Sequence, residues 1–347
     1  MERIENNTVV ATVTGKMAIA DYERIKPFPK EAWTYELSGE YIVPKKAIGE
    51  WVDESDGTFI FDKQYDIGGT VYKTLIKADG FKTNAFKHLV FNCKFDADLK
   101  ELFEGNIFLR SVDFSGADME DVTEMDGCFN NCSKLKEVIF SSERGTANLR
   151  NLVSMYCAFA ECTKLKEIDF TGVNLTSLSN LSKAFVDCSK LEAIKFGDNN
   201  MQNVEQAYQM FKSCEDLKAV TLGEAEFSKC QDFAEMFDGC KELTGVNLSH
   251  FSPSNTITCE SMFRGCKRLC RIDISCFEGA EITNMCEMFF GCKRLNDVDF
   301  GCINLAQVNC LGIFGDCENL GSYVSGEGWF CSAIPGCPGK FITVEPV

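Results

Sequence analysis

Histidine and proline are scarce in this chain of 347 residues, with 2 and 7 copies. Two histidines, His88 and His250, are too few for the clusters that hold zinc or supply a general base. The motif Cys-x-x-Cys is absent although the chain has 20 cysteines, which argues against a zinc ribbon or a thioredoxin-like redox site. No GxxxxGK[ST] phosphate loop is present either. We therefore expect no enzymatic activity, no metal and no cofactor.

Long apolar runs are also missing. No segment approaches the ~18 consecutive apolar residues of a membrane-spanning helix. The opening segment, MERIENNTVVATVTGKM, carries acidic residues and lacks the apolar core of a signal peptide. These features predict no insertion into a membrane and a cytoplasmic location.

The charge balance is strongly acidic, with 35 Lys and Arg against 52 Asp and Glu and a formal net charge of -17. An acidic surface repels phosphate backbones, so we expect no nucleic-acid partner. Hydrophobic residues make up 45% of the chain, which is enough for a large buried core.

A thirteen-residue phrase recurs along the chain. It reads MFDGCKELTGVNL at 236–248, MFRGCKRLCRIDI at 262–274 and MFFGCKRLNDVDF at 288–300. The general form F-x-x-C-x-x-L-x-x-[VI]-x-[FLI] occurs in nine copies, almost all 26 residues apart. Their phenylalanines are Phe103, Phe129, Phe159, Phe185, Phe211, Phe237, Phe263, Phe289 and Phe314. The first copy has Asn106 where the others have cysteine. Such a period predicts a solenoid, in which each copy buries its apolar face against its neighbours.

Each copy combines two periodicities. The second half, such as Leu135-Val138-Phe140, ends with apolar residues two apart, as in a β-strand. The first half, such as Val122, Met125, Cys128, Phe129 and Cys132, follows one face of a helix. We therefore predict an α/β repeat in which short helices alternate with strands of a parallel sheet.

The repeated cysteine lies between a buried Phe and a buried Leu. Cysteine behaves there as a small hydrophobic residue, so we predict buried, reduced thiols. Disulfides between stacked copies are the alternative, and they require an oxidising compartment.

The combination V-x-x-M-x-x-M-F-x-x-C with L-x-x-[VI]-x-[FLI] resembles the BspA-like leucine-rich repeat family, in its variant with an M-F-x-x-C core. The resemblance covers residues 99–325. It implies a curved leucine-rich-repeat solenoid with its parallel sheet on the concave face. It also implies a non-enzymatic binding or adhesion protein of bacteria or parasitic protists. Because such proteins are displayed outside the cell, surface display or secretion by a leaderless route is the alternative location.

The segments on either side of the repeats differ from them. Residues 1–98 alternate apolar and polar residues between turn signals, which predicts a β-rich N-terminal domain or cap. Residues 326–347 are expected to form a C-terminal cap or tail. Within the repeats, four extra residues between Phe129 and Phe159 predict a loop near 141–150.

The outward strand positions vary from copy to copy while the core positions repeat. Varied side chains on a rigid wall form a recognition surface, so we expect a protein partner to bind there. The candidate partner-binding residues are Asp169, Lys195, Thr221, Asn247, Arg271, Asp273, Asp297 and Asp299. A second candidate is a basic rim patch made of Lys267, Arg268, Lys293 and Arg294. The alternative function is structural, with the solenoid joining copies or a larger complex through its ends. The oligomeric state stays open.

Overall fold

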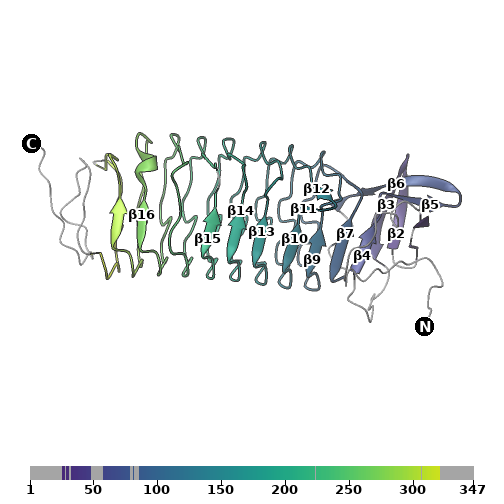
Figure 1. The fold of residues 1–347 in the computed structure, drawn as a ribbon, viewed down its shortest axis with the longest axis horizontal. Helices are drawn as coiled ribbons and strands as arrows, with labels where there is room; N and C mark the ends of the chain where they lie inside the picture. Colours follow the sequence, from purple (N-terminus) through teal and green to yellow (C-terminus); the bar gives the residue numbers. More distant parts are fainter. Residues whose placement is uncertain are drawn as a thin grey trace, which may run out of the picture.

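The structure is a computed structural model that describes residues 26–27, 29–30, 33–47, 58–78, 81, 86–222, 224–305 and 307–320. The predicted C-terminal cap or tail at 326–347 lies outside these residues. The repeats stack in a nearly straight row along the long axis of the molecule (Figure 1). Each repeat is one rung of the stack, and like residues of successive rungs lie side by side.

The regular elements are short β-strands and one 3-10 turn. They are β1 Lys26–Pro27, β2 Trp33–Ser38, β3 Tyr41–Ala47, β4 Thr58–Phe61, β5 Gln64–Ile67, β6 Thr70–Ile76, β7 His88–Phe91, β8 Lys94–Phe95, β9 Ser111–Asp113, β10 Glu137–Ile139, β11 Ser141–Ser142, β12 Gly145–Thr146, β13 Glu167–Asp169, β14 Ala193–Lys195, β15 Ala219–Thr221, β16 Arg271–Asp273, η3 Ser275–Phe277 and β17 Asp297–Asp299.

The strands of the repeats pair in parallel and in register, as the sequence predicts. Ile168 of β13 faces Ile194 of β14, and Ile194 faces Val220 of β15. Each step is one repeat, so identical positions become neighbours across the sheet. We call the wall formed by these strands the strand wall.

The strand wall is not continuous within the described residues. It consists of the sheets β4-β7-β9-β10, β13-β14-β15 and β16-β17. The breaks lie between β10 and β13 and at residues 243–248, where no strand forms. In the rung of residues 243–248, Val246 is only partly buried. The equivalent residues Ile194 and Ile272 of other rungs are buried.

The predicted short helices are wrong. In the described residues the segment that carries Met and Phe is a series of tight turns, with no α-helix. Two residues of each series adopt the left-handed conformation. They are the residue two before the repeated Phe, such as Lys183 (φ 57°), and the residue before the repeated Cys, such as Asp187 (φ 59°). A left-handed residue ends a helix, so two of them four positions apart exclude one.

The turns close through backbone hydrogen bonds from residue i to residue i−3. Examples run from the amide of Ala158 to the carbonyl of Met155, and from Cys162 to Phe159 (3.0 and 3.2 Å). This spacing repeats every few residues, so it places the same apolar positions inward as a helix would. The helical period was therefore genuine, but consecutive turns satisfy it equally well.

The remaining amides of each turn series join successive rungs. Four of them donate to the next rung, for example Phe129 to the carbonyl of Ala158 (2.7 Å) and Asn131 to Ala160 (2.8 Å). Isolated parallel bridges at the start of each series continue this pairing from Asp98 to Asn309. We call this second wall the turn wall.

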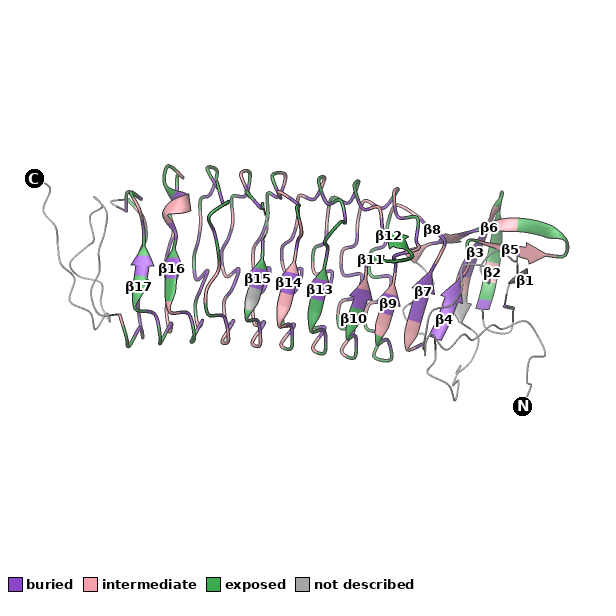
Figure 2. Ribbon diagram, in the orientation of Figure 1, coloured by how far each residue is buried: buried purple, intermediate pink, exposed green. Residues whose placement is uncertain are grey.

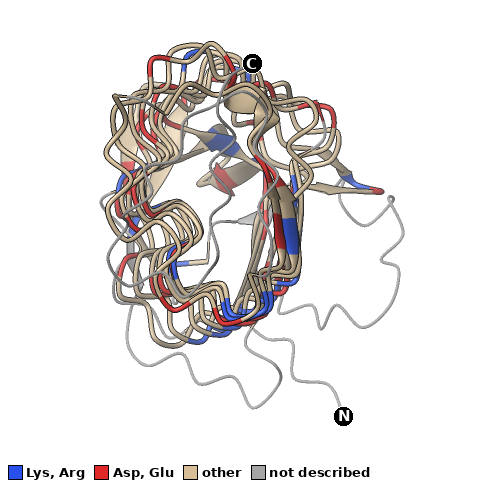
Figure 3. Cartoon of the chain, turned by 90° about the vertical axis from the view of Figure 1, so that its left-hand side faces the viewer, with Lys and Arg blue, Asp and Glu red and all other residues tan. Residues whose placement is uncertain are grey.

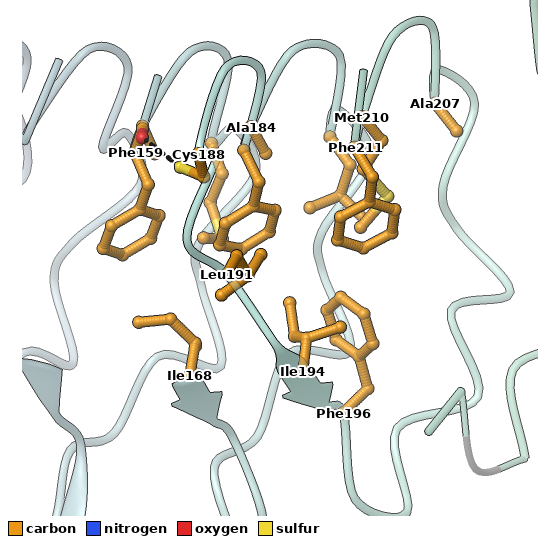
Figure 4. Packing of buried hydrophobic residues seen from close by; sticks show 14 of the residues in the cluster. Phe159, Ile168, Ala184, Cys188, Leu191, Ile194, Phe196, Ala207, Met210 and Phe211 are labelled. Carbon is orange, nitrogen blue, oxygen red and sulfur yellow. Dashed lines mark hydrogen bonds between the residues drawn. The ribbon is translucent and has the colours of Figure 1, made fainter. Parts of the chain in front are cut away.

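The repeated phenylalanines stack in one unbroken line inside the turn wall, as predicted. The ring centroids of Phe211 and Phe237 lie 5.4 Å apart, and those of Phe237 and Phe263 also lie 5.4 Å apart. The stack extends from Phe103 to Phe314. Figure 4 shows part of it, with the strand residues Ile168 and Ile194 below the rings.

The repeated cysteines are buried beside this stack. The thiol of Cys188 donates to the carbonyl of Phe159 in the preceding rung (2.9 Å), and that of Cys214 donates to Phe185 (3.1 Å). The same bond recurs at every repeated cysteine from Cys132 to Cys317. The carbonyl of Phe159 already accepts the amide of Cys162. The thiol of Cys188 therefore supplies a second hydrogen bond to a carbonyl oxygen that water does not reach.

The N-terminal part of the structure is rich in β-strands, as expected. Residues 26–95 contribute a sheet with the order β1-β5-β6-β3-β2, and β8 pairs with β6. Strands β4 and β7 belong instead to the sheet of β9 and β10. The predicted boundary after residue 98 thus lies between β7 and β9, two strands paired in register.

An aromatic cluster joins the N-terminal part to the first rungs. Trp33 packs on Phe61 and Phe86, with ring centroids 5.1 and 5.3 Å away. Phe61 stacks on Phe91, and Phe91 stacks on Phe114 of the first rung (5.1 and 5.6 Å). One hydrophobic core therefore runs from Trp33 into the repeats.

The extra residues of the second repeat form an exposed antiparallel hairpin of β11 and β12. This confirms the loop expected near residues 141–150. The hairpin folds back onto earlier rungs, where Arg144 pairs with Asp113 (2.5 Å) and Ser142 bonds to Ser115 (2.7 Å).

Candidate functional site

The strand wall presents alternate side chains to solvent. In β13 and β16 the central residue is buried and both neighbours are exposed, as Figure 2 shows by colour. This alternation follows from the period of a strand with one buried face. The predicted partner-binding residues lie on its outward side, but the wall divides them into two groups.

The first group lies on β13, β14 and β15. Asp169, Lys195 and Thr221 are neighbours in register. The ammonium of Lys195 lies 2.5 Å from Glu167 and 3.3 Å from Asp169. These two carboxylates, Glu167 first, raise the pKa of Lys195. Partial burial acts to raise the pKa of Asp169, but hydrogen bonds from Thr171 and Lys195 outweigh it, so the pKa falls.

The second group lies on β16 and β17. Arg271 is the register neighbour of Asp297 and binds one of its carboxylate oxygens through two nitrogens (3.0 and 2.6 Å). Asp273 is the register neighbour of Asp299, so two like charges lie side by side. A pair of this kind costs some stability.

Each aspartate of that pair also has a structural use. The carboxylate of Asp273 accepts the amide of Ser275, and that of Asp299 accepts the amide of Gly301 (both 2.9 Å). Asp169 makes the same bond to Thr171 (2.8 Å). Side-chain hydrogen bonds to the amide two residues on stabilise turns. Turn formation therefore accounts for these aspartates without a partner.

Asn247 lies between the two groups, in the rung at 243–248 that forms no strand. Its side-chain oxygen accepts the amide of Ser249 (3.0 Å), so the turn that follows is kept even where the strand is lost.

The predicted basic rim patch is partly neutralised. We define the rim as the residues between the repeated Cys and the strand. Arg268 pairs with Glu242, and Lys293 pairs with Glu318 (2.6 Å). The bond to Glu318 raises the pKa of Lys293. Lys267 and Arg294 form no ion pair within the described residues. The sequence holds the signal for this pairing, since Arg268 and Glu242 are one repeat apart.

A more strongly basic part of the rim lies at the N-terminal end of the solenoid, and the sequence reasoning missed it. Arg110, Lys134, Lys136 and Lys164 are exposed there, and none forms an ion pair in the part of the chain that the structure describes. Two exposed apolar residues, Ile107 and Phe108, precede them. We call these six residues the N-terminal rim.

The turn wall also carries two tyrosines that sequence reasoning missed, the exposed Tyr156 and the half-buried Tyr208. The ammonium of Lys183 lies between Tyr156 and Tyr208, 6.0 and 5.7 Å from the ring centroids. The hydroxyl of Tyr208 donates to Glu235 (3.4 Å). Both tyrosines lie three residues before a repeated Phe, so reading that column along the repeats would have found them.

Features of other site classes were sought in the same residues. Among the residues that the structure describes, no group of three or more His, Cys, Asp or Glu side chains could hold a metal ion. No helix among them is long and apolar enough to cross a membrane.

The stacked rungs with parallel strands, a repeated L-x-x-[VI]-x-[FLI] segment and a buried M-F-x-x-C core define a leucine-rich-repeat solenoid of the BspA-like type. The model of the family described as "Mycoplasma protein of unknown function, DUF285" matches residues 97–223 and 208–326. The chain belongs to this family. None of the curated proteins compared with the chain matches it.

Several solved structures are similar in fold to this chain. A leucine-rich repeat protein from Bacteroides ovatus ATCC 8483 is 16% identical, with a TM-score of 0.41 and coverage of 85% of this chain and 70% of that one. A leucine rich cell surface protein from Faecalibacterium prausnitzii A2-165 is 15% identical, with a TM-score of 0.36 and coverage of 85% and 93%. The pneumococcal vaccine antigen PcpA is 11% identical, with a TM-score of 0.35 and coverage of 90% and 97%.

Proposed function

We propose that this protein is a non-enzymatic recognition scaffold that binds a protein partner on its strand wall. The observation that supports the proposal is the contrast between inward and outward positions of the same strands. Inward positions hold Ile or Val in rung after rung, while outward positions change from Asp169 to Lys195 to Thr221. Core packing requires the first pattern, whereas the second is not set by packing, although Asp169 also accepts the amide of Thr171 in the turn that follows.

The group on β16 and β17 is the better candidate for the centre of the contact. Arg271 and Asp297 are held in a fixed arrangement by their two hydrogen bonds, so little side-chain entropy is lost when a partner binds. Asp273 and Asp299 present two carboxylate groups beside them. A partner with a basic residue at this point would relieve the repulsion between the two aspartates. In this proposal the strand wall forms the concave side of the complex, and residues 1–98 cover the N-terminal end of the core.

The test is partner capture by the triple variant Arg271→Ala, Asp273→Ala, Asp299→Ala. Binding energy concentrates in a few residues of an interface, so we expect capture of the partner from a host lysate to fall by roughly tenfold or more. The matched control is Glu205→Ala, Gln231→Ala, Glu260→Ala, which changes three exposed residues of the turn wall. The control should capture normally, and equal capture by both variants would contradict the proposal.

Deletion of residues 1–98 is not a clean control for this experiment. It removes β7, which pairs with β9, and it removes Phe91 from its stack on Phe114. A loss of capture after that deletion would report on the exposed core as well as on binding.

Assembly of copies through the ends of the solenoid is the second candidate function. The open ends of a repeat stack expose apolar surface unless a terminal element covers them. Sedimentation velocity over a range of protein concentrations distinguishes the two. A constant monomer favours the scaffold, and growth in size with concentration favours assembly.

A further inference from the structure

The N-terminal rim differs from the rest of this acidic protein in both charge and polarity. The rungs that begin at Asn106, Cys132 and Cys162 carry Arg110, Lys134, Lys136 and Lys164 on their exposed edge. A fifth cation, Lys166, lies 3.7 Å from Glu192. Glu137 and Glu167 begin the strands beside this edge, and Glu167 is already bound to Lys195. Glu104 and Glu161 lie just before the rim of the first and third rungs.

The cations occupy neighbouring rungs, so they form a row. The amide of Lys136 donates to the carbonyl of Arg110 (2.7 Å), which places the first two rungs in direct contact. Thr163 bonds through its hydroxyl to the carbonyl of Ser133 (3.3 Å), which joins the second rung to the third. The strands in Figure 1 point away from this edge. Figure 3, which looks along the stack from its C-terminal end, shows blue Lys and Arg segments of successive rungs at the lower edge, with red Asp and Glu segments among them.

The apolar pair begins this row. Ile107 and Phe108 are 49% and 48% exposed, and they are adjacent in the chain, whereas the other large apolar residues exposed among the described residues have no such neighbour in the sequence. In the next two rungs the corresponding positions hold Ser133 with Lys134 and Thr163 with Lys164. The first rung thus has apolar residues where the next two rungs have polar rim residues. At this position the apolar side chains remain about half exposed to solvent.

The backbone holds this apolar pair in place. The side-chain oxygen of Asn106 accepts the amides of Phe108 and Leu109 (both 3.1 Å). Asn106 and Leu109 are both buried, so the turn from Asn106 to Leu109 is anchored at both ends. The ammonium of Lys134 lies 5.9 Å from the centre of the Phe108 ring, which places charge directly beside the apolar tip.

We propose that the N-terminal rim docks the protein onto the surface of an anionic phospholipid bilayer. Apolar side chains at a fixed turn tip enter the boundary between headgroups and acyl chains, while adjacent lysines and arginines remain at the level of the anionic headgroups. A row of cations along a straight edge matches a flat target.

The net charge of the protein does not oppose this contact strongly. Electrostatic forces in physiological salt fall off over about 8 Å. Of the 52 acidic residues, 23 lie beyond residue 170, in the part of the chain that follows the N-terminal rim. Docking at the rim places its cations next to the bilayer, and salt screens the acidic groups that lie further than about 8 Å from it.

The test is co-sedimentation of the full chain with vesicles of phosphatidylserine and phosphatidylcholine in low-salt buffer. The rim variant is Arg110→Gln, Lys134→Gln, Lys136→Gln. Each Lys or Arg near an anionic surface contributes a roughly fivefold factor in affinity. We therefore expect the rim variant to bind on the order of 100-fold more weakly. Added salt should weaken the wild type, and vesicles of phosphatidylcholine alone should not sediment it.

The matched control is Lys241→Gln, Arg268→Gln, Lys293→Gln, which removes the same charge from the same rim. Each of these cations is paired with an acidic residue, Glu215, Glu242 or Glu318. The control should keep wild-type binding. The same reduction in both variants would show that only net charge matters and would overturn the proposal.

A second variant tests the apolar contribution separately. Ile107→Ser, Phe108→Ser gives the first rung a polar rim without altering charge, and because both side chains are about half exposed its melting temperature should fall only slightly. We expect roughly tenfold weaker vesicle binding. No sedimentation of the wild type with anionic vesicles would overturn the proposal. Retention on immobilised polyglutamate in that case would point to an acidic protein as the partner. Vesicle binding is independent of the strand wall, so failure here and failure of the proposed scaffold function can be told apart.

Discussion

The turn wall and the strand wall are built from the same repeats, but their continuity differs. In the described residues the turn wall joins every rung from Phe103 to Phe314 by ring stacking, thiol hydrogen bonds and amide ladders. The strand wall breaks between β10 and β13 and again at residues 243–248. The stack therefore survives local loss of its sheet. This teaches that the turn wall carries the structural constraint and leaves the strand wall free to vary.

The largest expected effect is alkaline unfolding, because the repeated buried thiols belong to the turn wall and are absent from the inward positions of the strand wall. Burial raises the pKa of Cys132 and of Cys188 to about 12, and unfolded thiols titrate near about 8.5. Between about pH 9 and pH 12 the unfolded chain loses these protons while the folded protein keeps them. Unfolding then releases protons, so stability should fall steadily as pH rises through this range. Circular dichroism during a pH titration measures the effect.

Thiol labelling is the control for the alkaline experiment. At about pH 9 iodoacetamide should label the exposed Cys302 in the folded protein and leave the buried Cys188 unmodified until the chain unfolds. Mass spectrometry of peptides reads out both sites. Equal labelling of the two in folded protein would show that the turn wall does not protect its thiols.

The next effect compares one residue from each wall of the same rung. Phe237→Ala removes a ring from the middle of the stack, and we expect a loss of about 3–5 kcal/mol in the free energy of unfolding. Val246→Ala removes a partly buried side chain where the sheet is already broken, and should cost about 1 kcal/mol. Urea denaturation gives both values. Similar costs for the two would contradict the greater importance of the turn wall.

The smallest effect concerns two glycines of that rung. Gly239 has a φ of 77° and belongs to the turn wall, so Gly239→Ala should destabilise by about 1–2 kcal/mol. Gly245 lies in the broken strand, and the nearest atom to an added Cβ is the carbonyl oxygen of Arg271 at 3.9 Å. Gly245→Ala should therefore stabilise by about 0.5 kcal/mol through reduced entropy of the unfolded chain. We expect the melting temperature to fall in Gly239→Ala and to rise in Gly245→Ala.

The sequence predicted the repeat, its register and the buried Phe and Cys positions, because the Phe recurs in nine copies and the Cys in eight. It did not predict the turns. Residues such as Glu161, Lys183 and Asp187 adopt left-handed conformations but carry no preference for them strong enough to be read from sequence. Neighbouring rungs impose the conformation by accepting their amides, as Val186 does for Glu161 (2.8 Å).

The candidate surfaces were predictable in part. The outward strand positions follow from alternation alone. The pairing of Arg271 with Asp297 could also have been foreseen, since the two are one repeat apart at the same strand position. The breaks in the strand wall could not, because residues 243–248 keep the apolar pattern of their neighbours. The N-terminal rim was missed because its cations Arg110, Lys134, Lys136 and Lys164 belong to three different copies, which only the stacking brings together.

Most amides in the ladder of the turn wall point one way, which gives the stack an electrical direction, although the amide at the start of each series, such as Val153 to Thr123, points back. In rung after rung, donors such as Phe129, Phe159 and Phe185 point their N–H groups toward the C-terminal neighbour. Each peptide unit has a dipole of about 3.5 D, and aligned peptide dipoles add. The C-terminal end of the solenoid is thus the positive pole and the N-terminal end the negative pole. Two copies meeting end to end are favoured to join head to tail, because only that order continues the field.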